Sequence, residues 1–148
     1  MPGPSWSLLI GAAVFCVACD PGYQLRPVGW VPQGYDWSRD FGEFSIRTGP
    51  LSGFIGEWWI APTFEIYGNS DAVTLKAASL HTVRGDYPAV ISPHFAGAPP
   101  GGGRLAVTWH FDPEHRAPDI LGRSAKITLD LAVGAAPRTV QIDYERVY

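Results

Sequence analysis

The sequence predicts an all-β protein, a single antiparallel sandwich of two sheets that is immunoglobulin-like and has about seven strands. From Glu43 onward, apolar and polar side chains alternate with a period of two, which is typical of strands that bury one face. Glycine and proline are abundant, at 17 and 14 residues, which favours turns over long helices. The immunoglobulin-like arrangement rests on the number and spacing of strands, because the Cys–Trp–Cys pattern of true immunoglobulin domains is absent.

The first two predicted strands cover residues 43–48 and 58–67. In the second, the side chains expected to face the core are Trp58, Ile60, Phe64 and Ile66. Trp59 and Tyr67 belong to the opposite face. Pro62 cannot donate a ladder hydrogen bond, so this strand is predicted to lie at a sheet edge or to carry a bulge. The residues that follow, 68–71, have the composition of a hairpin turn.

Five further strands complete the predicted sandwich. Residues 73–80 change phase between Ala77 and Ala78, which predicts a β-bulge. A weaker strand covers residues 89–95 and is interrupted by Pro93. Clear alternation marks the last three strands, at 105–111, 127–133 and 140–145. Only residues 119–122 are expected to form a helical turn.

Length and charge narrow the classes of function. A chain of 148 residues is enough for one domain whose core needs no disulfide staples. The net charge of −3 and the isoelectric point of about 5.7 provide no basic footprint, so no nucleic-acid partner is expected. Low charged content together with many aromatic residues argues against global disorder.

An uncharged apolar stretch, Ser7 to Ala18, precedes Cys19 near the start of the chain. It is shorter than the roughly 20 residues of a spanning helix but has the length of the hydrophobic region of a signal peptide. With Val17 and Ala18 just before Cys19, it resembles the export signal of bacterial lipoproteins. That resemblance implies cleavage after Ala18, a diacylglyceryl group on the Cys19 thiol, and a lipid anchor in the bacterial cell envelope. Asp20 resembles an inner-membrane retention signal, which implies the periplasmic face of the inner membrane.

Other interpretations of this segment stay open. A conventional cleaved signal, an uncleaved anchor or a soluble core element would show a similar apolar run. Cys16 and Cys19 also form a C-x-x-C pair. Redox pairs lie at polar helix N-termini, however, and zinc sites need a second pair of ligands that this sequence lacks. We therefore expect no cofactor besides the covalent lipid on Cys19.

Three regions are predicted: a signal peptide at 1–18, a lipidated N-terminus and arm at 19–38, and the sandwich domain at 39–148. The arm is rich in proline, glycine and aromatic residues, among them Trp30, Tyr35 and Trp37. A fully flexible linker would not carry so many aromatic side chains, so the arm is expected to dock on the sandwich.

No motif predicts catalysis. The sequence contains no G-x-S-x-G elbow and no H-E-x-x-H pair. The glycine-rich stretch 98–103 lacks the lysine and helix of a phosphate cradle, so it is expected to be a mobile loop. Arg84-Gly85-Asp86 spells an integrin-type tripeptide, but it also has the composition of an ordinary turn. Because the members of a catalytic triad meet only in space, a small hydrolase remains an alternative.

The densest group of candidate metal ligands is His110, Asp112, Glu114 and His115. Zinc would prefer the histidines and calcium the carboxylates. A solvent-exposed strand end followed by a turn at Pro113 would contain the same residues. We therefore expect no metal there.

Aromatic residues are the better indication of function, because they exceed what one sandwich core needs. Trp59 and Tyr67 share a strand face and are candidates for an exposed platform that stacks on sugar or peptide. In the alternative, the aromatic side chains of the arm cover this face. We expect a membrane-anchored envelope lipoprotein with a non-catalytic binding or structural domain, and with an envelope protein or a glycan as its partner. A carbohydrate- or peptidoglycan-binding module is the main alternative.

Overall fold

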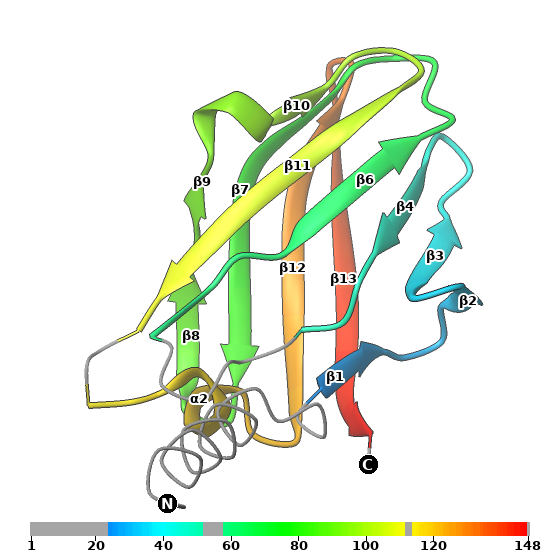
Figure 1. The fold of residues 1–148 in the computed structure, drawn as a ribbon. Coiled ribbons are helices and arrows are strands. Elements are labelled where there is room, and N and C mark those ends of the chain that lie inside the picture. The colour runs from blue at the N-terminus through cyan, green and yellow to red at the C-terminus, as the bar shows by residue number, and fades with distance from the viewer. Residues whose placement is uncertain (1–23, 52–57, 112–113, 148) are drawn as a thin grey trace, which may run out of the picture.

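The computed structural model describes residues 24–51, 58–111 and 114–147. Thirteen strands in this part of the chain form two antiparallel sheets that pack face to face (Figure 1). This arrangement confirms the predicted all-β sandwich. The leader, Cys16, Cys19 and Asp20 lie outside the described residues, so the anchor stays a prediction.

One sheet has six strands, in the order β1, β13, β12 and β7, with both β8 and β10 paired to β7. The bounds of its strands are β1 Gln24–Pro27, β7 Val73–Thr82, β8 Gly85–Pro88, β10 Gly97–Ala98, β12 Ser124–Val133 and β13 Ala136–Val147.

The other sheet has seven strands, in the order β2, β3, β4, β6 and β11, with β5 and β9 also paired to β11. The bounds of its strands are β2 Val31–Gln33, β3 Asp36–Asp40, β4 Ser45–Thr48, β5 Trp59–Ile60, β6 Thr63–Tyr67, β9 Val90–Ile91 and β11 Gly102–His110.

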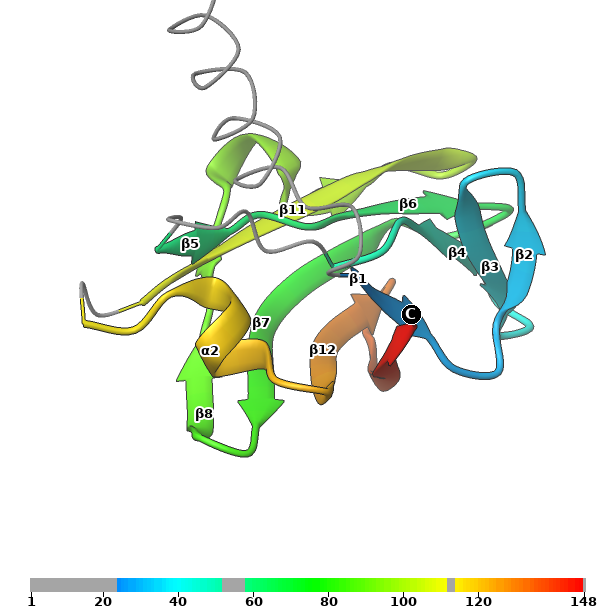
Figure 2. The same cartoon turned by 60° about the horizontal axis from the view of Figure 1, so that its bottom comes forward.

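Two short helices are found among the described residues, the 3-10 helix η1 (Pro93–Phe95) and the α-helix α2 (Ala117–Leu121). The predicted helical turn at 119–122 thus overlaps the last part of α2, and Gly122 is the C-cap of this helix. Turned so that its lower end comes forward, the molecule shows α2, the β7–β8 turn and the start of β1 at one end of the sandwich (Figure 2). Neither helix has the length and apolar character needed to cross a membrane.

Seven of the strands have the connectivity of an immunoglobulin-like core. The chain passes from β4 to its neighbour β6 and crosses to β7 in the other sheet. It returns to β9 and β11, which lies beside β6, and then crosses again to β12 and β13 beside β7. Immunoglobulin domains order their strands in the same way, with A, B, E and D in one sheet and C, F and G in the other. The seven predicted strands correspond to this core, and the other six extend it.

The segment expected to be a docked arm is built into both sheets. β1 pairs with β13 at the edge of the six-stranded sheet, while β2 and β3 extend the seven-stranded sheet beyond β4. The expected domain boundary at residue 39 therefore falls inside β3. All three residues of β2 are exposed, so this strand has no buried face from which alternation could be recognised.

The connection at 68–71 is not the predicted hairpin, because β6 and β7 belong to different sheets. Its residues reverse the chain as expected, but the strands on either side pair elsewhere. Asn69 is buried, and its side-chain amide donates to the carbonyl oxygens of Asp71, at 2.8 Å, and Pro99, at 2.9 Å. Local composition thus predicted the turn but not the partner of either strand.

Pro62 lies between β5 and β6, two positions before Phe64, where the pairing of β6 with β4 begins. Among the described residues, the chain at Pro62 therefore has a strand partner on the β11 side only, in agreement with the predicted edge position. β5 and β6 pair with β11 in one continuous register, from Trp59 opposite His110 to Tyr67 opposite Gly102. The Val107 N–H still donates to the Pro62 carbonyl oxygen, at 3.4 Å, but Pro62 has no N–H with which to return a bond. The missing donor divides this strand into β5 and β6.

The predicted bulge in β7 is confirmed at a neighbouring position. Asp130 of β12 pairs with Ala77, and the next residue, Leu131, pairs with Leu75, so Lys76 is the extra residue. The bulge keeps Val73 and Leu75 in the core before it, and Ala78 and Leu80 after it.

The core fills the space between the two sheets. The largest of its fully buried side chains are Trp109, Tyr144 and Phe64. The Trp109 indole N–H donates to the Tyr87 carbonyl oxygen at 2.8 Å, which ties β11 to β8 in the opposite sheet. Trp58 was expected in this core but is 44% exposed, because alternation gives the direction of a side chain and not the extent of the sheet that faces it.

Both sides of the sandwich are bridged. On one side, successive short strands of segment 85–98 pair with β7, then β11, then β7 again. On the other, Leu25 of β1 exchanges two backbone hydrogen bonds of 2.9 Å with Leu51, which follows β4. The edge strands β1, β2, β5, β8, β9 and β10 have at most four residues, and each contains a proline or is followed by one within two residues: Pro27, Pro32, Pro62, Pro88, Pro93 and Pro99.

Candidate functional site

A groove with a volume of about 460 Å³ lies between β1 and the β2–β3 hairpin. Strand β1, the β2–β3 hairpin and Pro50 form its walls. The lining residues are Gln24, Arg26, Pro32, Gly34, Tyr35, Asp36, Trp37 and Pro50. We call this site the aromatic groove, because Tyr35 and Trp37 provide its largest side chains.

A tight turn presents Tyr35 to solvent. Gln33 and Asp36 pair across the hairpin, so its loop has two residues, Gly34 and Tyr35. Gly34 has φ +65°, whereas Tyr35 has negative φ. Glycine with positive φ at the first loop position is the requirement of a type II′ turn, which suits the twist of a hairpin. Tyr35 at its tip is 95% exposed.

Trp37 has one side against the protein and one in the groove. It is half-buried and packs against the hydrophobic core. The Arg26 guanidinium carbon lies 5.7 Å from the centre of the Trp37 ring, which is within the range of a cation–π contact. This contact holds Arg26 in the groove and joins β1 to β3.

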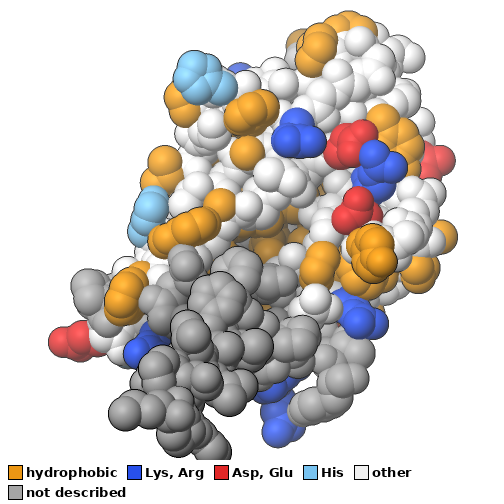
Figure 3. Space-filling model, in the orientation of Figure 1, with side chains coloured by type: hydrophobic (Ala, Val, Ile, Leu, Met, Phe, Trp, Pro, Cys, Tyr) orange, Lys and Arg blue, Asp and Glu red, His pale blue; other side chains and the backbone are white. Residues whose placement is uncertain are grey.

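Charged side chains gather beside the aromatic groove, on the outer face of the seven-stranded sheet (Figure 3). Arg47 donates to one Glu65 carboxylate oxygen from Nη2, at 2.6 Å, and from Nε, at 3.2 Å. Its Nε also lies 4.0 Å from the Asp36 carboxylate. The hydrogen bond and the charge of Glu65 raise the pKa of Arg47, so this cation is permanent. Asp36 therefore carries its carboxylate between a fixed cation and the groove.

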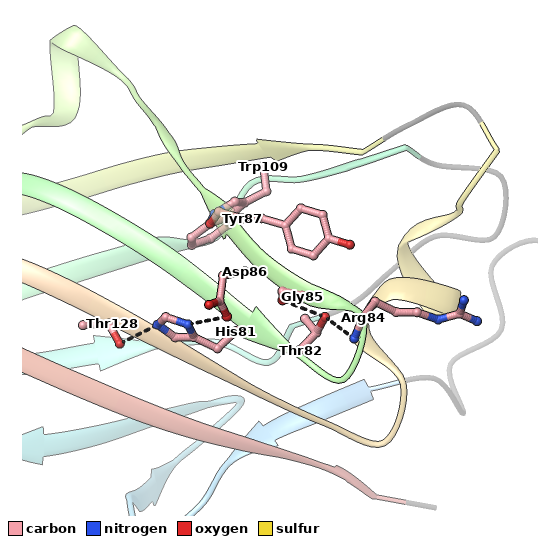
Figure 4. A network of polar contacts seen from close by, with 8 residues as sticks. All are labelled: His81, Thr82, Arg84, Gly85, Asp86, Tyr87, Trp109 and Thr128. Carbon is pink, nitrogen blue, oxygen red and sulfur yellow. Dashed lines mark hydrogen bonds and ion pairs between the residues drawn. The ribbon is translucent and has the colours of Figure 1, made fainter.

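A second concave region, with a volume of about 440 Å³, lies over β7, β12 and β13. We call it the histidine trough. His81 Nδ1 lies 2.8 Å from Asp86 Oδ1, and His81 Nε2 lies 3.1 Å from Thr128 Oγ1 (Figure 4). With the proton on Nδ1, the imidazole donates to Asp86 and accepts from the Thr128 hydroxyl. This is the order of groups in an acid–histidine–hydroxyl triad.

The β7–β8 turn brings His81 and Asp86 together. The two residues are direct partners in the β7–β8 ladder. Between them, the Thr82 hydroxyl donates to the Gly85 carbonyl oxygen at 3.2 Å and accepts from the Arg84 N–H at 3.1 Å. The Arg84-Gly85-Asp86 tripeptide is thus part of a hairpin whose carboxylate is paired with His81.

The position of Thr128 limits the chemistry of the histidine trough. Thr128 lies in the middle of β12 and pairs with Ser79 of β7 on one side and Gln141 of β13 on the other. Acyl transfer needs hydrogen-bond donors aimed at the developing oxyanion. In a central strand the neighbouring backbone N–H groups are used by the two ladders. His81 therefore has a hydroxyl partner, but there is no backbone oxyanion hole at Thr128.

A buried phenol lies beneath the same trough. Tyr144 borders it and is otherwise enclosed in the core. Burial raises the pKa of Tyr144 well above its ordinary value, and the nearby Thr48 hydroxyl lowers it only in part. No described residue forms a hydrogen bond of ordinary geometry with the Tyr144 oxygen. The phenol is held in its neutral form by the apolar interior.

The predicted platform residues do not lie together. Trp59 and Tyr67 share the outer face but are eight positions apart on one register, or about 26 Å along the strand direction. The alternative, a cover made of the arm's aromatic residues, is not seen over Trp59, which is 47% exposed. Trp30 instead packs edge-on against Phe41 at 5.9 Å, and Phe41 stacks on Phe44 at 5.4 Å.

The candidate metal ligands are spread out over the end of β11 and the segment before α2. His110 is exposed and lies opposite Trp59, Glu114 is exposed, and His115 is half-buried. Asp112 lies outside the described residues. Within the described ranges, no three His, Cys, Asp or Glu side chains are grouped so that they could hold a metal ion.

Sequence reasoning missed both concave regions, although each had a signal. Tyr35 and Trp37 were among the aromatic residues in excess of the core, but the groove also needs β1, whose pairing was not predicted. His81 and Asp86 flank a turn symmetrically, which was recognisable. Thr128 lies 47 positions from His81, so its contribution depends on the pairing of β7 with β12.

Comparison with known proteins adds no assignment to this geometry. No protein-family model matches this chain, and no curated protein matches it either.

Proposed function

We propose that this chain is a bacterial envelope lipoprotein, anchored through a lipid on Cys19, whose sandwich domain binds a ligand or partner without catalysing a reaction. The observation that carries the binding role is the aromatic groove. It combines two aromatic side chains with a few polar groups in a concave site, as small-ligand sites do. Its lining residues include one carboxylate, Asp36, but no second acid to form the pair that glycoside hydrolysis uses, and no serine, cysteine or histidine.

The anchor is supported by the sequence before the first strand. The apolar stretch 7–18 ends next to Cys19, and β1 begins at Gln24, only five positions later. Five residues span at most about 18 Å. An acylated Cys19 would hold β1 and the adjoining groove close to the bilayer, and Asp20 favours the inner membrane.

Metabolic labelling tests the anchor. We expect the full chain, expressed in a bacterium and fed an alkyne fatty acid, to become labelled and to collect in the membrane fraction. Cys19→Ala should abolish the label and release the protein from the membrane, because the acylated thiol is gone. Cys16→Ala is the matched control and should keep both properties. Membrane fractionation of Cys19→Ala that equals that of the natural sequence would refute the proposed anchor.

A carbohydrate- or peptidoglycan-binding module is the second candidate function, and the aromatic groove favours it. Its original basis, a platform of Trp59 and Tyr67, is not supported by the distance between them. Tyr35 and Trp37 take their place, since they line one concavity together with charged and amide side chains.

A further inference from the structure

We propose that the aromatic groove binds a neutral glycan strand, with sugar rings stacked on Tyr35 and Trp37. This inference rests on the proposed function, the binding role of the sandwich domain, and names the class of its ligand. The site is assigned to the hairpin and β1, and not to Trp59 on the face of the neighbouring strands.

The aromatic pair has the form of a stacking site. Tyr35, at the hairpin tip, and Trp37, in β3, are two positions apart, so their Cα atoms are separated by at most about 7 Å. Neighbouring rings of a glycan strand can reach both side chains at this separation. The C–H bonds on one face of a pyranose are apolar and carry partial positive charge. They are attracted to the negative face of an aromatic ring.

The two rings of the stacking site differ in how far they are exposed. Tyr35 is almost fully exposed at the hairpin tip, whereas Trp37 is half-buried against the core. Trp37 therefore provides a rigid surface at the base of the site. The apolar area of the Tyr35 ring is in contact with water in the unbound protein. A ligand that stacks on the ring removes this area from water, which favours binding.

The polar groups of the groove match hydroxyl groups rather than an ion. Arg26 has only donors, Asp36 as a carboxylate has only acceptors, and Gln24 has both. A sugar hydroxyl can donate and accept at once, so it can satisfy each of these groups. A polyanion would be repelled by Asp36 and a polycation by Arg26. Charges of both signs thus favour an uncharged ligand.

These polar groups are held in position before any ligand arrives. Arg26 is held over the Trp37 ring, and Asp36 lies 4.0 Å from Arg47, which is itself bonded to Glu65. Side chains that are already ordered lose less conformational entropy on binding. A proline-rich peptide would also stack on the aromatic rings. Such a peptide has few hydrogen-bond donors for Asp36, however, whereas the hydroxyl groups of a glycan can bond to Asp36 and Arg26 alike.

Calorimetry on the full chain in detergent tests this assignment, with cellotetraose and the tetramer of N-acetylglucosamine as neutral probes. We expect at least one of them to bind. Trp37→Ala should weaken binding at least about tenfold, because it removes the base of the site. Tyr35→Ala should weaken binding several-fold without disturbing the fold, since Tyr35 is exposed. Trp37→Phe should recover most of the affinity, and Trp59→Ala is the matched aromatic control that should bind normally.

Each other outcome would overturn the inference. Failure of both probes to bind would exclude a neutral glycan. Binding lost in Trp59→Ala but kept in Tyr35→Ala would move the site to the other aromatic position. Binding of a proline-rich peptide but of neither sugar would replace the ligand class. None of these results changes the labelling of Cys19, so the proposed anchor is tested separately from the ligand.

Discussion

The aromatic groove and the histidine trough are nearly equal in volume, at about 460 and 440 Å³, but they differ in where their side chains are placed. The groove takes its rings from a hairpin at the edge of one sheet. The trough is lined by His81, whose ring contacts Thr128 on a central strand of the other sheet and Asp86 on the adjacent hairpin. His81, Asp86 and Thr128 have the residue types of a catalytic triad, whereas the groove has an acid, Asp36, but no histidine and no serine or threonine.

The difference shows that position within a sheet decides what a set of residues can do. A hydroxyl in the middle of a central strand is surrounded by backbone donors that the ladders already use. A residue at a hairpin tip has open space around its ring and is exposed to any ligand. We therefore assign binding to the groove and a structural role to the His81 hydrogen bonds. Four experiments test this difference between the two regions.

The largest effect is expected for Trp109→Phe, in the core between the two sheets and away from the groove. The change removes the hydrogen bond to the Tyr87 carbonyl of β8 and leaves a gap in the core. We expect the free energy of unfolding in urea to fall by about 2–4 kcal/mol, while glycan binding in the groove is unchanged. Trp59→Phe, which is exposed, is the control with a change within about 0.5 kcal/mol. A loss below about 1 kcal/mol for Trp109→Phe would mean that the hydrogen bond and packing of Trp109 contribute little to stability.

Alkaline pH tests the buried phenol beneath the trough. The folded protein holds the Tyr144 proton above the pKa of about 10 at which the unfolded chain releases it. Stability from this group is thus complete below pH 10 and is lost as pH rises, by about 1.4 kcal/mol per pH unit. We expect urea unfolding at about pH 9 and pH 11 to show this fall in the natural protein but a smaller one in Tyr144→Phe. Equal falls in both proteins would mean that Tyr144 ionises freely, and Tyr35→Phe is the exposed control.

A smaller effect is expected when the triad-like groups are removed. Thr128→Val and His81→Ala should each change the free energy of unfolding by about 1 kcal/mol or less, because His81 and Asp86 are partly exposed. Neither change should alter the rate at which the protein hydrolyses an activated ester such as p-nitrophenyl acetate. A hydrolysis rate that depends on both His81 and Thr128 would contradict the structural role assigned to these residues and would indicate a catalytic one.

The smallest effect is expected for Arg47→Met beside the groove. The Arg47–Glu65 pair is short, but both side chains are more than a third exposed, so solvent screens it. We expect a change of about 0.5 kcal/mol or less in the free energy of unfolding. Glycan affinity should change more than stability, since Asp36 loses the cation beside it. Urea unfolding and calorimetry on the same variant separate the two effects.

The sequence was most informative where several alternating residues are buried. β7, β11, β12 and β13 each bury three or more side chains on one face, and all four were predicted. β2 buries none and β10 has two residues, so a period of two cannot be recognised there. The chain reversal at 68–71 was predicted from local composition, but its crossing between sheets depends on distant partners.

The two concave regions were predictable to different degrees for the same reason. The aromatic residues of the groove stood out by their number, and the turn between His81 and Asp86 stood out by its composition. Neither signal included the second element, β1 for the groove and β12 for the trough. Those elements are brought in by strand pairing over long sequence distances, which no local pattern specifies.

The prolines at the sheet edges bear on how copies of this protein behave when they are crowded together. An open edge strand offers unpaired N–H and C=O groups to which a strand of another molecule can add, and this is how edge-to-edge aggregation begins. Here the edge strands are at most four residues long, and Pro27, Pro32 and Pro88 each remove a donor from them. At these strands, neighbouring copies held at high local density are offered only short segments on which to template one another.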